Sequence, residues 1–180
     1  CNEALHVLAG ENKVLQTIGG DLSTKAWRTD VPEPASLVIS TIAGGPTLQT
    51  WEHVARALAA SAAVIQEGGA IALCTELKEP PLPALKRMAF ESSEFSPPED
   101  RPAHTAEEEL VVQRIRQTLQ HASVYLVSEL ESHDTESIGF THVDDPESLQ
   151  RLGEQCDSCI LVNNAQYAAP VLLQQETQTL

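Results

Sequence analysis

The sequence predicts an α/β protein with a Rossmann-like or flavodoxin-like, doubly wound and mostly parallel sheet of about five strands. Short apolar runs of strand length alternate along the chain with longer segments in which apolar residues recur every three or four positions. Glycine or proline separates many of these segments, as expected where a chain leaves a strand or begins a helix. This alternation is typical of parallel strands that are joined by helices.

The first half of the chain contains the clearest strand–helix–strand pattern. A helix is predicted over residues 50–66, because Trp51, Val54 and Leu58 recur on one face, and the glycines at 68–69 are predicted to end it. In order, the elements predicted here are strands over 5–9 and 36–42, the helix over 50–66, a strand over 70–77 and a short helix over 82–88.

The second half continues the alternation with shorter elements. Asp145 is predicted to cap a helix whose first turn contains Pro146. In order, the predicted elements are a helix over 106–122, a strand over 123–129, a helical turn over 135–138, an extended piece over 140–143, a helix over 146–155 and a strand over 159–162. Residues 91–105 are predicted to be a mobile acidic loop. Residues 1–173 are expected to form a single domain, with 174–180 as a flexible tail.

The charge of the chain excludes several classes of function. Its 11 basic and 26 acidic residues give a formal net charge of −15. The excess lies in the second half, where residues 91–180 carry 4 basic and 17 acidic groups. A field of this sign repels a polyanion, so nucleic acid is not an expected partner. No apolar run has the ~20 residues that a membrane span needs, and no secretory signal is visible, so a cytoplasmic protein without a membrane partner is expected.

The turn between the strand over 36–42 and the following helix is the strongest candidate site. Ligands of open parallel sheets gather at the carboxyl ends of strands, where helix amino termini converge. The predicted cleft-lining residues there are Gly44, Gly45, Thr47, Gln49 and Trp51. The same glycines also suit a simple tight turn, and neither a dinucleotide-binding nor a P-loop pattern is present.

His53 and Arg56 stand three residues apart on the following helix and therefore share a face. An arginine at that place could hold a substrate carboxylate through two hydrogen bonds, and a histidine could exchange a proton. An exposed surface pair is the alternative. The other histidines show no metal-ligand spacing, and Cys156 with Cys159 is more typical of two reduced, buried cysteines than of a zinc site. No metal site is predicted in this chain.

Several segments in a fixed order resemble the second domain of the lactate racemase family. The most specific part is residues 31–77, and the likeness covers most of residues 5–170. The segments that carry the resemblance are Val-Pro-Glu-Pro-Ala-Ser-Leu-Val-Ile-Ser at 31–40, Gly-Gly-Pro at 44–46, Ala-Arg-Ala-Leu at 55–58, Gly-Gly-Ala-Ile-Ala-Leu at 68–73, Val-Tyr-Leu-Val-Ser at 124–128 and Ala-Gln-Tyr-Ala at 165–168.

The resemblance implies the carboxy-terminal, substrate-covering domain of a two-domain isomerase. Such an enzyme interconverts the stereoisomers of a 2-hydroxy acid by hydride removal and return at a nickel-pincer nucleotide. The family's cofactor lysine, nickel-binding histidine and acid–base histidines belong to the amino-terminal domain, so no catalytic residue and no bound cofactor are expected in this chain.

The residues of this chain that the resemblance places against the substrate are His53 and Arg56. The family has a glutamine and a lysine at these two places, so His53 is a departure and Arg56 keeps the positive charge. The expected partners are the protein's own amino-terminal domain and a small 2-hydroxy acid. The alternative hypothesis is a non-enzymatic ligand-binding or interaction module with the same fold.

Overall fold

The computed structural model describes residues 7–90 and 105–173. Its centre is a five-stranded parallel sheet with the strand order β5-β4-β3-β2-β6. The strands of this sheet are β2 (Ala35–Thr41), β3 (Ile65–Cys74), β4 (Ser123–Val127), β5 (Thr141–His142) and β6 (Cys159–Val162). This arrangement confirms the predicted Rossmann-like or flavodoxin-like fold class.

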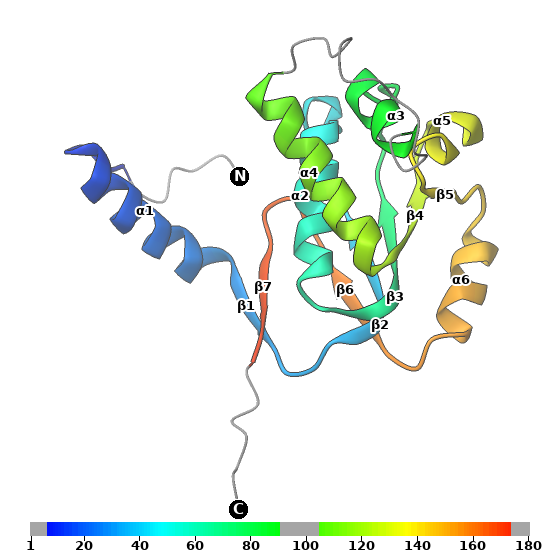
Figure 1. Cartoon of the computed structure of the whole chain (residues 1–180). Coiled ribbons are helices and arrows are strands. Elements are labelled where there is room, and N and C mark those ends of the chain that lie inside the picture. The colour runs from blue at the N-terminus through cyan, green and yellow to red at the C-terminus, as the bar shows by residue number, and fades with distance from the viewer. Residues whose placement is uncertain (1–6, 91–104, 174–180) are drawn as a thin grey trace, which may run out of the picture.

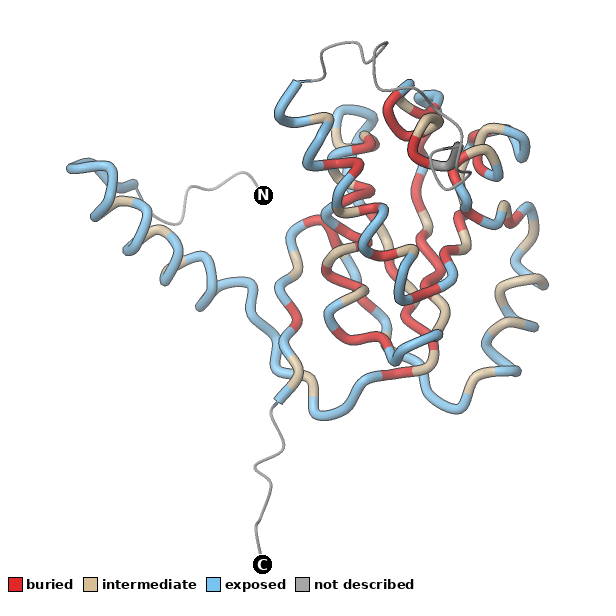
Figure 2. The backbone as a smooth tube through the Cα atoms, viewed as in Figure 1, coloured by how far each residue is buried: buried red, intermediate tan, exposed pale blue. Residues whose placement is uncertain are grey.

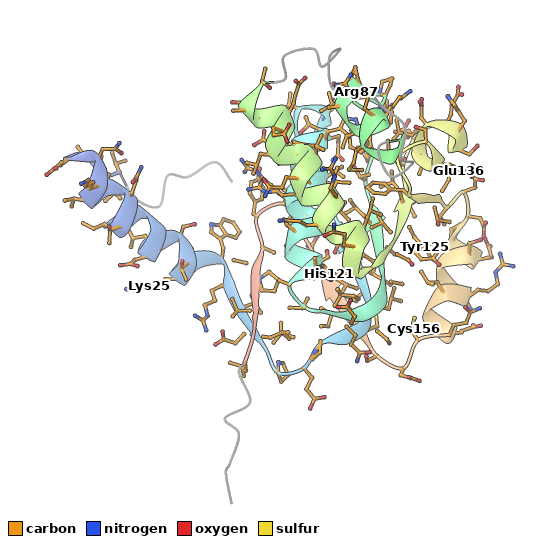
Figure 3. All side chains as sticks on the ribbon, viewed as in Figure 1. Lys25, Arg87, His121, Tyr125, Glu136 and Cys156 are labelled. Carbon is orange, nitrogen blue, oxygen red and sulfur yellow. The ribbon has the colours of Figure 1, made fainter. Side chains whose placement is uncertain are left out.

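Helices lie on both sides of the sheet (Figure 1). The helices are α1 (Asn12–Trp27), α2 (Trp51–Ala62), α3 (Pro83–Phe90), α4 (Ala106–His121), α5 (Ser132–Glu136) and α6 (Pro146–Glu154), with a short 3₁₀ turn at Pro46–Leu48. α2 and α4 lie on one side and α6 lies on the other (Figure 1). Tyr125 of β4 lies on the α6 side of the sheet, as Figure 3 shows.

The main hydrophobic core lies between the sheet and helices α2 and α4. Val38 of β2 and Ile71 of β3 are paired neighbours that are fully buried, and Val54 and Leu58 of α2 are buried against the same layer. Figure 2 shows the buried residues concentrated in these strands and helices, whereas α1 carries none. Burial of these apolar side chains is the main force that holds the sheet and the two helices together.

A second, two-stranded sheet joins the two ends of the described chain. β1 (Arg28–Val31) pairs in parallel with β7 (Ala169–Leu172), and α1 leads directly into β1. The segment over 169–172, for which no element was predicted, therefore forms a strand because it finds a partner about 140 residues earlier in the chain. Neither α1 nor this sheet was predicted.

Several predicted boundaries differ from the structure, most clearly those of the strand predicted over 5–9 and the helix predicted over 50–66. Residues 7–9 of the strand predicted over 5–9 have no regular structure and are exposed, and the rest lies outside the described residues. α2 ends at Ala62, and the glycines at 68–69 lie inside β3, where the register with β2 is irregular. Gly68 has a φ of +74°, which suits an irregular strand because glycine alone adopts it without strain.

The predicted acidic loop and tail lie almost entirely outside the described residues. Only Thr105, at the end of the loop, is described, and it caps α4 in a reciprocal capping box with Glu108. Among the helices that the structure describes, none has both the length and the apolar character that a membrane crossing requires.

Candidate functional site

The loop that follows β2 is held in place by the side chain of Gln49. Its amide nitrogen donates to the carbonyl oxygens of Ile42 and Gly44, at 3.3 and 3.2 Å. Its carbonyl oxygen accepts from the Thr75 hydroxyl at 2.6 Å and from the Glu76 backbone N–H at 3.1 Å. Gln49 is buried, so these bonds join the loop to the carboxyl end of β3.

Trp51 does not line an open cleft, contrary to the prediction. Its side chain is 2% exposed and belongs to the core, and its indole N–H donates to the carbonyl oxygens of Glu79 and Pro80 at 3.0 Å each. Trp51 is the first residue of α2 and lies on the same apolar face as Val54 and Leu58, so its side chain points into the core between α2 and the sheet. Trp51 therefore anchors the start of α2.

Gly44, Gly45 and Thr47 are exposed and shape the turn of the loop. Gly44 has a φ of +120°, and a Cβ there would overlap the side chain of Leu48, so only glycine fits without rearrangement. Gly44, Gly45 and Thr47 line neither of the two cavities described below, so their role in a cleft stays a prediction.

Thr50 precedes α2, and its hydroxyl caps the helix by accepting from the His53 backbone N–H. The His53 ring nitrogen Nδ1 lies 3.0 Å from the same hydroxyl, and the ring forms a T-shaped contact with Tyr167 at a centroid distance of 6.1 Å. The Arg56 guanidinium forms an ion pair with Glu52 one turn earlier, and its side chain is 44% exposed. His53 and Arg56 thus both face the side of α2 on which residues 166–170 lie.

The segment after β6 is fixed to the end of β2. The Thr41 hydroxyl donates to Asn163 Oδ1 at 2.8 Å, and the Thr41 backbone carbonyl accepts from the Ala165 backbone N–H at 2.9 Å. Asn164 has a φ of +53°, a conformation that asparagine tolerates better than most residues. The Gln166 side chain donates to the Ala43 carbonyl at 2.9 Å. The amide residues at the end of β6 therefore form a turn that is joined to the glycine loop.

A cavity of about 500 Å³ lies between α2, α4 and residues 166–170. Its polar lining consists of Glu52, Arg56, Arg114, Gln166 and Tyr167, and the rest is mainly alanine, with Leu110 and Pro170. Sequence reasoning named Arg56 and missed Arg114. The sequence does contain a pattern that predicts the position of Arg114. Arg114 stands four residues after Leu110 and next to the buried Ile115, at the edge of the apolar face of α4.

A smaller cavity of about 330 Å³ lies at the carboxyl ends of β3 and β4. Its lining includes Gln49 and Thr50 together with three glutamates and Lys78, which is paired with Glu129 at 2.9 Å. The hydrogen bond and charge of Glu129 raise the pKa of Lys78. This cavity is where a parallel sheet conventionally binds ligands, but its lining is acidic overall.

The cysteines and acidic groups form no metal cluster in the part of the chain that the structure describes, where no three His, Cys, Asp or Glu side chains are placed to hold a metal ion. Cys156 is half-buried and Cys159 is exposed, so the expectation of two buried cysteines is wrong for Cys159. Partial burial, and then the neighbouring Cys156, raises the pKa of the Cys159 thiol, which disfavours the reactive thiolate.

Comparison with solved structures gives one with a similar fold. The fold matches that of the lactate racemase apoprotein from Thermoanaerobacterium thermosaccharolyticum with a TM-score of 0.69 and 15% sequence identity. The match covers 94% of this chain and 43% of the solved chain, so the chain spans less than half the length of that protein. No protein-family model matches the sequence. No curated protein matches it either.

Proposed function

We propose that this chain is the carboxy-terminal, substrate-covering domain of a racemase or epimerase that acts on a 2-hydroxy acid, and that the domain is inactive alone. The observation that carries the proposal is the match of 94% of the chain to less than half of a lactate racemase apoprotein. Residues 1–173 would then form the second domain of a larger protein, and the first domain would complete the active site.

The proposed role of this chain is to bind and orient the substrate. Arg56 uses one guanidinium nitrogen for Glu52, which leaves further N–H donors for a carboxylate or for the oxygen of a keto intermediate. His53 would supply a ring nitrogen close to the same face of α2, beside Tyr167. The nickel-pincer nucleotide, held by the amino-terminal domain, would supply the chemistry that accepts and returns a hydride.

Substitution of Arg56 tests this role in the full-length protein. In Arg56→Ala, we expect a loss of kcat/KM of about 10- to 100-fold, because one charge-assisted hydrogen-bonded contact is worth about 1.5–3 kcal/mol. The side chain is exposed, so the fold should be retained. The matched control is Arg151→Ala, which removes an exposed arginine on α6 that donates to the Ser148 hydroxyl at 2.9 Å, lies 3.9 Å from Asp145 and does not line the cavity beside Arg56.

The reaction itself is tested with a 2-hydroxy acid that carries deuterium at C2. Hydride removal and return would give the opposite stereoisomer with the deuterium retained in ordinary water, whereas a proton-transfer racemase would lose the label to solvent. Unchanged turnover and affinity in a folded Arg56→Ala variant would remove Arg56 from the substrate contacts.

The alternative is a non-enzymatic ligand-binding module. It would use the cavity between α2, α4 and residues 166–170 as a ligand site in its own right. The two proposals differ in the amino-terminal domain that they require, because only the enzyme needs paired histidines and a cofactor-bearing lysine there.

A further inference from the structure

We propose that the outer edge of β6 pairs with β6 of a second copy of this chain, antiparallel about Leu161, so that two five-stranded sheets join into one continuous sheet. The inference concerns a surface that the proposed racemase role does not use, and it does not depend on that role. It rests on the position of β6 in the sheet, the direction of its backbone groups and its lack of charge.

β6 lacks the features that protect the other edge strands. The edge of a sheet exposes unpaired N–H and C=O groups, and proteins usually protect it with charged side chains, a proline or a very short strand. β5 has only two residues, β1 carries the ion pair of Arg28 and Asp30, and β7 contains Pro170. β6 has the sequence Cys-Ile-Leu-Val at one end of the five-stranded sheet. Among the described strands, its edge is therefore the most open to pairing.

Alternate residues of β6 direct their backbone groups away from β2. The Leu37 N–H donates to the Ser158 carbonyl at 3.0 Å, and Leu37 lies in register with Cys159. In a parallel ladder, every second residue turns its N–H and C=O toward the neighbouring strand. The groups of Ile160 thus face β2, whereas those of Cys159 and Leu161 point outward. No strand among the described residues pairs with that outer side, so a further strand can bind there.

A second copy fits this edge because β6 is complementary to itself. The Leu161 side chain is 76% exposed on this edge strand. Antiparallel pairing about a twofold axis at Leu161 brings the two Leu161 side chains together and places Ile160 opposite Val162 of the other copy. All of these side chains are apolar, so pairing removes exposed apolar surface from water. An axis perpendicular to the sheet keeps α2 of both copies on the same face of the joined sheet.

The distribution of charge also favours contact at this place. The chain carries a formal charge of −15, so two copies repel each other over most of their surface. No Asp, Glu, Lys or Arg stands between Asp157 and Glu176, and β6 lies within this uncharged stretch. Antiparallel pairing places Asp157 of the two copies at opposite ends of the paired strands. Two acidic chains can therefore approach along β6 with little repulsion.

The expected dimer is weak and reversible, because the edge is short. Two paired strands of four residues give an interface below the ~1,200 Å² of stable complexes, which corresponds to a Kd of about 10–100 µM. Sedimentation velocity of the 180-residue chain over this range should show conversion of a monomer to a species of twice its mass. In Leu161→Lys, the Kd should rise at least about tenfold, because the two lysines meet at the twofold axis.

Two control variants separate loss of pairing from other effects. Leu161→Ile keeps an apolar side chain with high strand propensity and should keep the Kd of the unsubstituted chain. Ile18→Lys places the same charge on another exposed apolar residue, 44% exposed, which lies on α1 and not on β6. This variant should also dimerise as the unsubstituted chain does. Circular dichroism of each variant checks that the fold is retained.

Amide hydrogen exchange measures the strand pairing itself. The Leu161 N–H points outward from the sheet, so it should exchange rapidly in dilute, monomeric chain and become protected at concentrations at which the dimer forms. The Ile160 N–H faces β2 and should be protected in both states. This contrast between neighbouring residues distinguishes pairing along the edge from association through any other surface.

The proposal is overturned if the folded chain stays monomeric at concentrations about tenfold above the expected Kd. It is also overturned if a folded Leu161→Lys variant dimerises as tightly as the unsubstituted chain, or if the Leu161 N–H exchanges equally fast in monomer and dimer. Loss of the dimer in Ile18→Lys alone would place the contact on α1 and likewise contradict it. A monomeric chain would leave the racemase proposal standing, and failure of hydride chemistry would leave the strand pairing standing.

Discussion

The Gln49 side chain makes four hydrogen bonds that fix the glycine loop, and its replacement by leucine should destabilise the protein markedly. Leucine has a similar volume but cannot accept from the Thr75 hydroxyl, which lies 2.6 Å from Gln49 in a buried position. A buried donor without a partner costs about 1–3 kcal/mol, and the weaker bonds to Ile42, Gly44 and Glu76 add about 1 kcal/mol in total. Added apolar burial offsets part of this, which leaves a net loss of about 2–3 kcal/mol.

Urea unfolding followed by circular dichroism measures this loss. With a typical m value of about 2 kcal/mol/M, the unfolding midpoint of Gln49→Leu should fall by about 1–1.5 M. The double variant Gln49→Leu/Thr75→Val is the informative control, because replacing both partners by apolar groups removes the stranded hydroxyl and should restore about 1 kcal/mol. A loss below about 0.5 kcal/mol in Gln49→Leu would refute the reasoning.

Two further predictions concern the first turns of helices. In Trp51→Phe, loss of the indole bonds to the carbonyls after β3 should lower the free energy of unfolding by about 1–2 kcal/mol, and a change under 0.3 kcal/mol in urea unfolding would contradict the anchor role. Asp145 caps α6, and hydrogen bonds from the Ser148 hydroxyl and backbone N–H lower its pKa. Its stabilising effect is therefore complete above the ordinary aspartate pKa and is lost as the pH falls through the lowered value. Carboxyl-carbon NMR titration should show this lowered pKa, and Ser148→Ala should return it toward the ordinary value; an unchanged pKa in that variant would be inconsistent with the assignment.

The central sheet could be predicted because its strands and helices carry their own local signal. β2 contains the apolar run Leu37, Val38 and Ile39, and α2 has Val54 and Leu58 at helical spacing, both fully buried in the structure. Capping residues also predicted the start of a helix correctly, as Asp145 did for α6. The apolar periodicity predicted a helix that is longer than α2, because the helical pattern continues past Ala62. In the structure Ile65 instead pairs with β2 and begins β3.

The parts that were missed depend on contacts between distant segments or on weak local signals. β7 is a strand only because β1 pairs with it, and no local pattern encodes that pairing. α1 contains Gly19 and Gly20 in its interior and buries no residue, so its helical pattern is weak. At the site, the position of Arg56 on the outer face of α2 was predictable from spacing, whereas the approach of Arg114 follows from the packing of α4 on α2.

The central claim is that this chain covers the active site of a nickel-pincer racemase or epimerase. The most direct measurement is the intact mass and nickel content of the full-length protein, produced together with the enzymes that build the pincer nucleotide. The account predicts one covalently attached, nickel-bearing nucleotide per chain, located in the amino-terminal domain. Folded full-length protein with no added mass and no nickel would contradict the claim and favour the non-enzymatic module.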